Sequence, residues 1–216
     1  MSLFELLQND NQTGEQVQGV VNAIVTNNQD PENMGRVKLK FPWRNGADES
    51  HWARIVTLMA GKDRGCFFVP EVGDEVLVAF EMGNIDHPYV IGSLWNGQDG
   101  PPEKNGDGKN NIRKIKSRSG HEIIFDDKDG KEKVTLQTKA GHRIVLDDTA
   151  MSEKIEIIDK SGSNSVVIDS VANEIVMESS MRLVLKSQTI EIDAGTQLTI
   201  KAGAALTIQG AIVNIN

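Results

Sequence analysis

The carboxyl-terminal part of this sequence lacks three kinds of residue. From Asp126 to Asn216 there is no aromatic residue, no proline and no cysteine, whereas all three Trp, the single Tyr and all six Pro lie before residue 103. This absence excludes a core packed with aromatic rings from that part of the chain. The two parts of the protein must therefore bury their apolar surface in different ways.

Cysteine is scarce throughout. Cys66 is the only one, so no intrachain disulfide can form. Within "GCFFVP" we interpret it as a small, buried apolar residue. A reactive thiol is the alternative interpretation, but Arg64 is the only nearby basic residue that would lower its pKa.

Basic residues are fewer than acidic ones, and the sequence contains no long apolar run. The formal net charge of −8 argues against a general nucleic-acid surface and against attraction to anionic lipid. The sequence begins without a basic region followed by a long apolar core, and no stretch is long enough to span a membrane. We therefore expect a protein that is made and folded in the cytoplasm and does not insert stably into a membrane.

Strand signals fill residues 17–98 at irregular spacing. In "RVKLKF", alternation places Val37, Leu39 and Phe41 on one face. Five or six short strands without a long helix predict a small closed barrel, most economically a five-stranded oligonucleotide/oligosaccharide-binding (OB) barrel. The predicted strands lie in 17–25, 36–41, 52–57, 65–70, 74–80 and 88–95.

Two segments are predicted to contain no strand. Residues 1–16 are an N-terminal arm in which Ser2 caps a short helix that ends at Gln8. Residues 99–118 are a linker, because Pro101-Pro102 and a Gly/Asn/Asp cluster exclude regular structure. Its basic residues form either a solvated collar or ion pairs with the acidic residues just downstream. They are Lys109, Arg113, Lys114, Lys116 and Arg118.

Residues 119–178 contain an internal repeat of 21 residues. "SGHEIIFDD" at 119, "AGHRIVLDD" at 140 and "SGSNSVVID" at 161 align without gaps. Their second halves also align, the third being one residue shorter. We therefore expect each unit to be two short strands joined by a turn, stacked on its neighbours because it cannot bury its own apolar side.

From residue 179 to 216 the repeat tightens to seven or eight residues. Each octad holds a three-residue strand and a corner, and Gly195 and Gly203 lie at corners where a Cβ is expected to obstruct the turn. The aliphatic residues come in pairs: Leu183 and Leu185, Ile190 and Ile192, Leu198 and Ile200, Leu206 and Ile208, and Val213 and Ile215.

A single chain with this pattern exposes unpaired strand edges, which favour aggregation. Three chains wound around one axis would pair those edges and turn the aliphatic residues inward, as a triangular prism. At about 4.7 Å per strand, the strands from 123 to 215 would build a shaft of about 50 Å. A single-chain β-solenoid is the alternative. The predicted trimer core is Leu183, Leu185, Ile190, Ile192, Leu198, Ile200, Leu206 and Ile208.

No group of residues predicts catalysis, a cofactor site or a metal site. His51, His87, His121 and His142 lack the spacing of metal ligands, and the last two share one position of successive repeats. The Asp pairs at 126–127 and 147–148 also repeat, and we interpret them as turn and strand-end residues instead of an acid/base pair.

An OB barrel can bind nucleic acid or sugar through aromatic residues on its strands. Trp43, Trp52 and Trp95 are scattered along the sequence, and the net charge is negative, so we expect no nucleic-acid partner. A ligand-binding OB module on an oligomeric β-solenoid remains the alternative function.

Three stretches carry a family resemblance. "DPENMGRVKLKFPW" (30–43) and "FFVPEVGDEVLVAFEMGNIDHPYVIGSLWNG" (67–97) closely resemble the OB domain of phage baseplate assembly protein V and of VgrG. "SRSGHEIIFDDKDGKEKV" (117–134) resembles the start of the triple-stranded β-helix that follows it in those proteins. The resemblance covers about residues 17–178 and implies an all-β protein, an OB barrel followed by an intertwined trimeric needle.

The same resemblance implies the central spike of a contractile injection system: a phage tail, a tailocin, an extracellular injection particle or a type VI secretion system. Such a spike is carried in the baseplate and driven into the target envelope when the sheath contracts. The short arm implies a separate hub protein, the linker has no room for a lysozyme domain, and no His-x-His tip follows His142. A PAAR-repeat tip protein is therefore expected on a platform formed by Ile212, Val213, Asn214, Ile215 and Asn216.

Overall fold

The computed structural model describes residues 16–44, 46 and 48–215. The chain divides into two units, Met1–Lys104 and Asn105–Asn216. The helix predicted over residues 2–8 lies outside the described residues. No α-helix occurs in the described part of the chain, which contains only strands and one short 3-10 turn, η1 (Glu81–Gly83).

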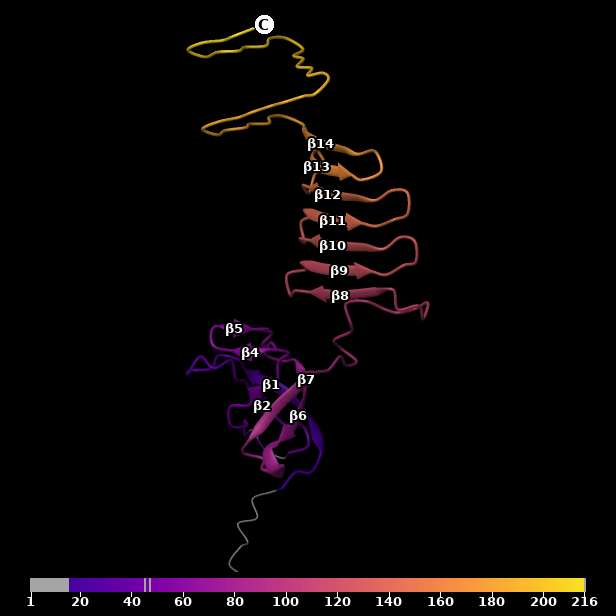
Figure 1. Ribbon diagram of the computed structural model, residues 1–216. Coiled ribbons are helices and arrows are strands. Elements are labelled where there is room, and N and C mark those ends of the chain that lie inside the picture. Colours follow the sequence, from indigo (N-terminus) through magenta and orange to yellow (C-terminus); the bar gives the residue numbers. More distant parts are fainter. Residues whose placement is uncertain (1–15, 45, 47, 216) are drawn as a thin grey trace, which may run out of the picture. The chain divides into compact units, whose positions relative to one another are not determined.

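The first unit is a closed barrel of five strands (Figure 1). Their order in the sheet is β2-β1-β6-β7-β3, and a pair of backbone hydrogen bonds between Val37 and Ala53 joins the β2 side to the β3 side. A small hairpin, β4 with β5, stands outside this sheet. The elements are β1 (Val20–Asn27), β2 (Lys38–Lys40), β3 (Arg54–Ile55), β4 (Ala60–Gly61), β5 (Arg64–Gly65), β6 (Glu75–Phe80) and β7 (Pro88–Ser93).

The barrel core follows from alternation along its strands. Val76, Val78 and Phe80 of β6 are buried, while the residues between them are only half-buried. The prediction that Val37, Leu39 and Phe41 share a face is confirmed, since all three are buried. The core consists of Ala23, Val25, Val37, Leu39, Phe41, Ala53, Val76, Val78, Phe80, Ile85 and Val90.

A buried ion pair orders the loop between β1 and β2. The Asp30 carboxylate accepts hydrogen bonds from the Arg36 guanidinium at 2.9 and 2.8 Å and from the backbone N–H of Glu32 and Met34. The Arg36 guanidinium holds the pKa of Asp30 well below its ordinary value, despite the opposing effect of burial. This pair fixes the shape of a loop that has few apolar contacts of its own.

One predicted strand of the barrel is wrong. Of residues 65–70, only Gly65 belongs to a strand, and Phe67 and Phe68 are 82% and 70% exposed. Cys66 is half-buried, not fully buried as predicted. The apolar run leaves the sheet through the β4–β5 hairpin, whose tight turn is incompatible with a continuous strand.

The second unit begins with a seven-stranded antiparallel sheet in which every strand pairs with its neighbours in sequence (Figure 1). The 21-residue repeat is confirmed, because β9, β11 and β13 begin at Glu122, Arg143 and Asn164. The strands are β8 (Ile112–Lys116), β9 (Glu122–Asp126), β10 (Lys133–Gln137), β11 (Arg143–Asp147), β12 (Lys154–Ile158), β13 (Asn164–Asp169) and β14 (Glu174–Ser179).

The first of these strands corrects the predicted linker. β8 occupies residues 112–116, within the range expected to lack regular structure, because the alternating "IRKIK" begins just after the Gly/Asn cluster and pairs with β9. Arg113, Lys114 and Lys116 pair with acidic residues downstream. Arg113 bonds Asp127, and the Nζ of Lys116 lies 2.8 Å from Glu122, whose pKa this contact lowers.

Residues 180–215 form no strand in the single chain, and Figure 1 draws them as an open trace beyond β14. Bends occur at 188, 195–196, 203–204 and 211–212, at the spacing of the predicted corners. At Gly195 and Gly203 an added Cβ would meet no atom within 4 Å, so the expected obstruction is wrong for the single chain.

Candidate docking surfaces

One face of the seven-stranded sheet is apolar and open. Direct cross-strand partners such as Val134 with Leu146, and Leu136 with Ile144, place aliphatic side chains in two columns along the sheet. The members are 37 to 66% exposed although they form one continuous surface. We call this the apolar face: Ile115, Ile123, Phe125, Val134, Leu136, Ile144, Leu146, Ile155, Ile157, Ile168, Ile175 and Met177.

The opposite face is less exposed and carries most of the charged residues, together with a middle column that includes Ile124, Val145 and Val167. Along one of its columns acidic and basic residues alternate, and we call this column the charge ladder: Asp126, Lys133, Asp147, Lys154 and Asp169. The Nζ of Lys133 lies 2.7 Å from Asp147, which is only 6% exposed. Burial would raise the pKa of Asp147, but hydrogen bonds from Lys133 and Thr149 outweigh it and lower the pKa to about 2.

In an ordinary sheet of a soluble monomer the apolar side is covered, whereas here it is open. The whole chain exposes 17,733 Å². A folded monomer of its mass is expected to expose about 9,800 Å². A contiguous apolar surface of this extent is typical of a protein–protein interface.

The turns at one end of the sheet stack on one another through histidine. The Nδ1 of His121 accepts the backbone N–H of Lys139 at 3.3 Å, and the Nδ1 of His142 accepts that of Lys160 at 3.2 Å. The equivalent bonds give both histidines the same structural role in successive repeats. In the third repeat Ser163 takes this position, and Asp159 closes the turn by accepting the Ser163 N–H.

The eight residues of the predicted trimer core are 53 to 65% exposed, and the single chain does not bring them together. Of the predicted tip platform, Ile212 is 82% exposed, Val213 49% and Ile215 87%, and Asn214 is exposed as well. Asn216 lies outside the described residues. The octads therefore continue the apolar face as a further exposed aliphatic segment.

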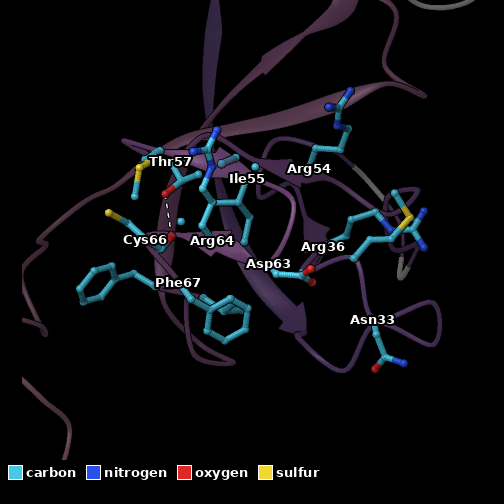
Figure 2. A pocket seen from close by; sticks show the side chains of 17 residues that line it. Asn33, Arg36, Arg54, Ile55, Thr57, Asp63, Arg64, Cys66 and Phe67 are labelled. Carbon is cyan, nitrogen blue, oxygen red and sulfur yellow. Dashed lines mark hydrogen bonds between the residues drawn. The ribbon is translucent and has the colours of Figure 1, made fainter.

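The barrel carries a hollow of 720 Å³ beside the β4–β5 hairpin (Figure 2). Arg36 and Asn33 reach it from the loop before β2, and Arg54 and Ile55 from β3. Figure 2 shows the hydroxyl of Thr57 donating to the carbonyl of Cys66, at 2.7 Å. Sequence reasoning missed this feature because it placed residues 65–70 inside the barrel.

The residues tested for chemistry do not form a reactive site. In the described part of the chain, no three His, Cys, Asp or Glu side chains are grouped as metal ligands. The Asp127 carboxylate pairs with Arg113. The Asp126 carboxylate accepts a hydrogen bond from the backbone N–H of Lys128 in the turn. No helix within the described residues is both long and apolar enough to cross a bilayer.

The three tryptophans do not share one binding surface. Arg36 and Lys38 lie over the Trp52 ring, at 5.9 and 5.7 Å from its centroid. Trp43 packs on Phe41, with ring centroids 5.7 Å apart. Trp95 lines a second, separate hollow of 360 Å³.

Comparison with known proteins finds a family model and relatives that are similar to the barrel. Residues 21–95 match the "Type VI secretion system/phage-baseplate injector OB domain". The type VI secretion system spike protein VgrG3 of Vibrio cholerae is 32% identical over 133 residues, which are 56% of this chain and 13% of that protein. The spike protein VgrG1a of Pseudomonas aeruginosa is 31% identical over 113 residues, 47% of this chain and 18% of that protein.

A third relative, the actin cross-linking toxin VgrG1 of Vibrio cholerae, is 33% identical over 110 residues, or 47% of this chain and 10% of that protein. The chain thus matches only about a tenth to a fifth of the length of these relatives. The match is to VgrG-type spike proteins of baseplates and type VI secretion.

Proposed function

Starting from this kinship with VgrG-type baseplate spike proteins, we propose that the chain is the structural central spike of a contractile injection system and acts as a homotrimer. The main observation behind the proposal is the open apolar face, which is followed along the chain by the exposed aliphatic residues of the octads. Each aliphatic side chain that other copies cover would contribute up to about 2 kcal/mol. None of that stabilisation is available to a monomer.

Three copies suit the regular bends. If each run between the bends of residues 188–212 forms one side of a triangular prism, a single chain occupies a given side only at every third run. Two further copies fill the levels that it leaves vacant, and every strand edge then has a partner. The result is an intertwined triple-stranded β-helix whose aliphatic residues point to a narrow axis.

The barrel and the needle have different tasks in this proposal. The barrel, made in the cytoplasm with the rest of the chain, seats the trimer on a separate hub protein of the baseplate. The needle transmits axial force when the sheath contracts and is delivered to the target envelope. Interlocked chains separate slowly, and such kinetic stability is what a puncturing device requires.

The needle end is proposed to carry a tip protein of the PAAR-repeat class. Ile212, in the last bend, and Ile215, just beyond it, are more than four-fifths exposed. In a trimer they would form a flat, three-fold apolar surface. The chain itself is proposed to have no enzymatic activity and no cofactor, so its function is mechanical.

Two experiments test the function. Quantitative mass spectrometry of purified injection particles from the producing cell should find three copies of this chain per particle, located in the baseplate fraction. Absence of this chain from intact particles would refute the proposed spike function. Binding of a labelled single-stranded oligonucleotide tighter than ~1 µM at physiological salt would instead favour the ligand-binding OB module.

A further inference from the structure

The β4–β5 hairpin projects apolar side chains into solvent on a well-defined scaffold. We call residues 56–68 the hairpin arm. Its exposed apolar residues are Val56 (59%), Leu58 (96%), Met59 (51%), Phe67 (82%) and Phe68 (70%). Aromatic residues of this kind dominate the energetics of protein interfaces.

The arm has a fixed shape. The N–H of Cys66 donates to the carbonyl of Met59 at 3.0 Å, and Thr57 Oγ1 donates to the carbonyl of Cys66 at 2.7 Å. At Gly65, with φ of +153°, an added Cβ would lie 2.5 Å from the Met59 carbonyl oxygen, so only glycine fits there. The arm is thus built to hold its exposed rings in place.

The arm is also locally basic in an acidic protein. Lys62 and Arg64 outnumber Asp63 within it, and Arg54 lies at its base, whereas the whole chain has a net charge of −8. Arg64 is exposed and has no carboxylate partner among the described residues. A surface that covers the arm should therefore offer an apolar contact and carboxylates.

The same barrel offers both an apolar contact and carboxylates at its second hollow. This hollow of 360 Å³ is lined by Asp74, Glu75, Leu94, Trp95 and Asp99, and we call it the acidic hollow. Trp95 is 70% exposed there. Amide donors from Asn22 and Asn96 hold the two oxygens of Glu75 at 2.7 and 3.1 Å, which orients its charge without neutralising it.

The arm and the acidic hollow are separate places on one barrel. The hollow is lined by the start of β6, the end of β7 and the residues that follow β7, and none of its lining residues belongs to the arm. A ring of three identical copies needs two different, complementary patches on each subunit. We propose that the hairpin arm of one copy docks in the acidic hollow of the next copy around the ring.

This inference rests on the proposed trimer and adds the residues that join its barrels. Arg64 would pair with Asp99 or Glu75 of the neighbour, and the phenylalanines would cover the neighbour's Trp95. Charge complementarity favours a second copy as the occupant, because both halves of the contact are present on the same chain. The alternative is that a hub protein covers the arm. The cross-linking test below distinguishes these two possibilities.

The single native cysteine permits a direct test. In Ser93→Cys, each full-length chain carries two thiols, Cys66 in the arm and the new one in the wall of the hollow, while the carboxylates of the proposed contact are kept. A short bis-maleimide should link neighbouring copies into covalent dimers and trimers. The matched control is Asp86→Cys, an exposed carboxylate elsewhere on the barrel, which should give no such bands.

The outcomes separate this inference from the proposed function. A trimer in light scattering with no Ser93→Cys cross-link, or with equal cross-links from both variants, would overturn the docking and leave the trimer standing. A monomer in light scattering would overturn the proposed function itself.

A charge exchange in the Ser93→Cys background tests the pairing. Arg64→Glu is expected to lower the yield of cross-linked dimers and trimers at least fivefold. Arg64→Glu with Asp99→Arg should restore most of that yield, as coupled residues do in a double-mutant cycle. Equal yields with and without Arg64→Glu, or no rescue in the double variant, would contradict the contact.

Discussion

The barrel and the needle bury apolar surface in opposite ways. The barrel gathers eleven hydrophobic residues into a core of its own, each less than 9% exposed. From residue 105 onward, only Val145 and Asp147 reach comparable burial among the described residues. The barrel therefore has the contacts to fold as a monomer, whereas the second unit lacks such a core. In the proposed trimer, the stability of the needle would depend on protein concentration during assembly.

The most disruptive way to test this difference is to place charge in the predicted trimer core. Ile200→Asp would bring three carboxylates to one apolar axis, where like charges and desolvation both oppose ionisation. We expect loss of the trimer, or of its resistance to heated detergent, in gel electrophoresis without boiling, while the barrel stays folded.

The control is Thr199→Asp, one residue away on the side expected to face outward, which should leave the trimer intact. If the two substitutions have equal effects, the assigned facing of the octads is wrong.

A second change tests the role of the needle tip separately from that of the needle shaft. Deleting residues 209–216 removes the proposed platform, so a 3:1 complex with a PAAR-repeat protein from the same gene cluster should disappear. Native mass spectrometry of the mixture measures the complex, and light scattering should still show a trimer. A truncated spike that still binds the tip protein would refute the platform.

A cavity in the barrel core should destabilise the first unit and leave the stability of the second unit unchanged. Val78 is fully buried, and Val78→Ala is expected to destabilise the barrel by about 2 kcal/mol through lost contacts and the cavity left behind. All three tryptophans precede residue 103, so their fluorescence reports barrel unfolding selectively. Resistance of the trimer to heated detergent should not change; a parallel loss would mean that the two units depend on each other.

The smallest expected effect concerns pH. The pKa of Asp147 is lowered from 3.8 to about 2, so its ion pair with Lys133 contributes fully above pH ~4 and is lost as the pH falls toward 2. Asp147→Asn should remove that part of the acid sensitivity of needle dissociation and lower stability at neutral pH. Unchanged acid dissociation profiles would show that the charge ladder is not a stabilising element.

Much of this architecture could be predicted because its signals are local. Alternation in "RVKLKF" predicted the inward side of β2, and the gap-free 21-residue repeat predicted where β9, β11 and β13 begin. The similarity of the barrel to the injector OB domain was predicted from long, specific stretches such as residues 67–97. In each case one short window of sequence contained the whole signal.

The remaining features depend on contacts between distant residues. An apolar run such as "GCFFVP" looks the same whether it lies in a barrel or on an exposed hairpin, and only the Gly65 turn distinguishes them. The bond from Lys139 to His121 joins residues 18 positions apart, so the sequence indicates a repeated role for the histidine but not its partner. The acidic hollow unites Glu75 with Asp99 only once β6 and β7 are paired.

The most direct test of the contrast between the units is the mass of the full-length protein in solution. We predict that light scattering on a size-exclusion column gives three times 23.7 kDa, or about 71 kDa, across the peak and on dilution to nanomolar concentration. A monodisperse species of 23.7 kDa would mean that a single chain tolerates its open apolar face, and would contradict the account.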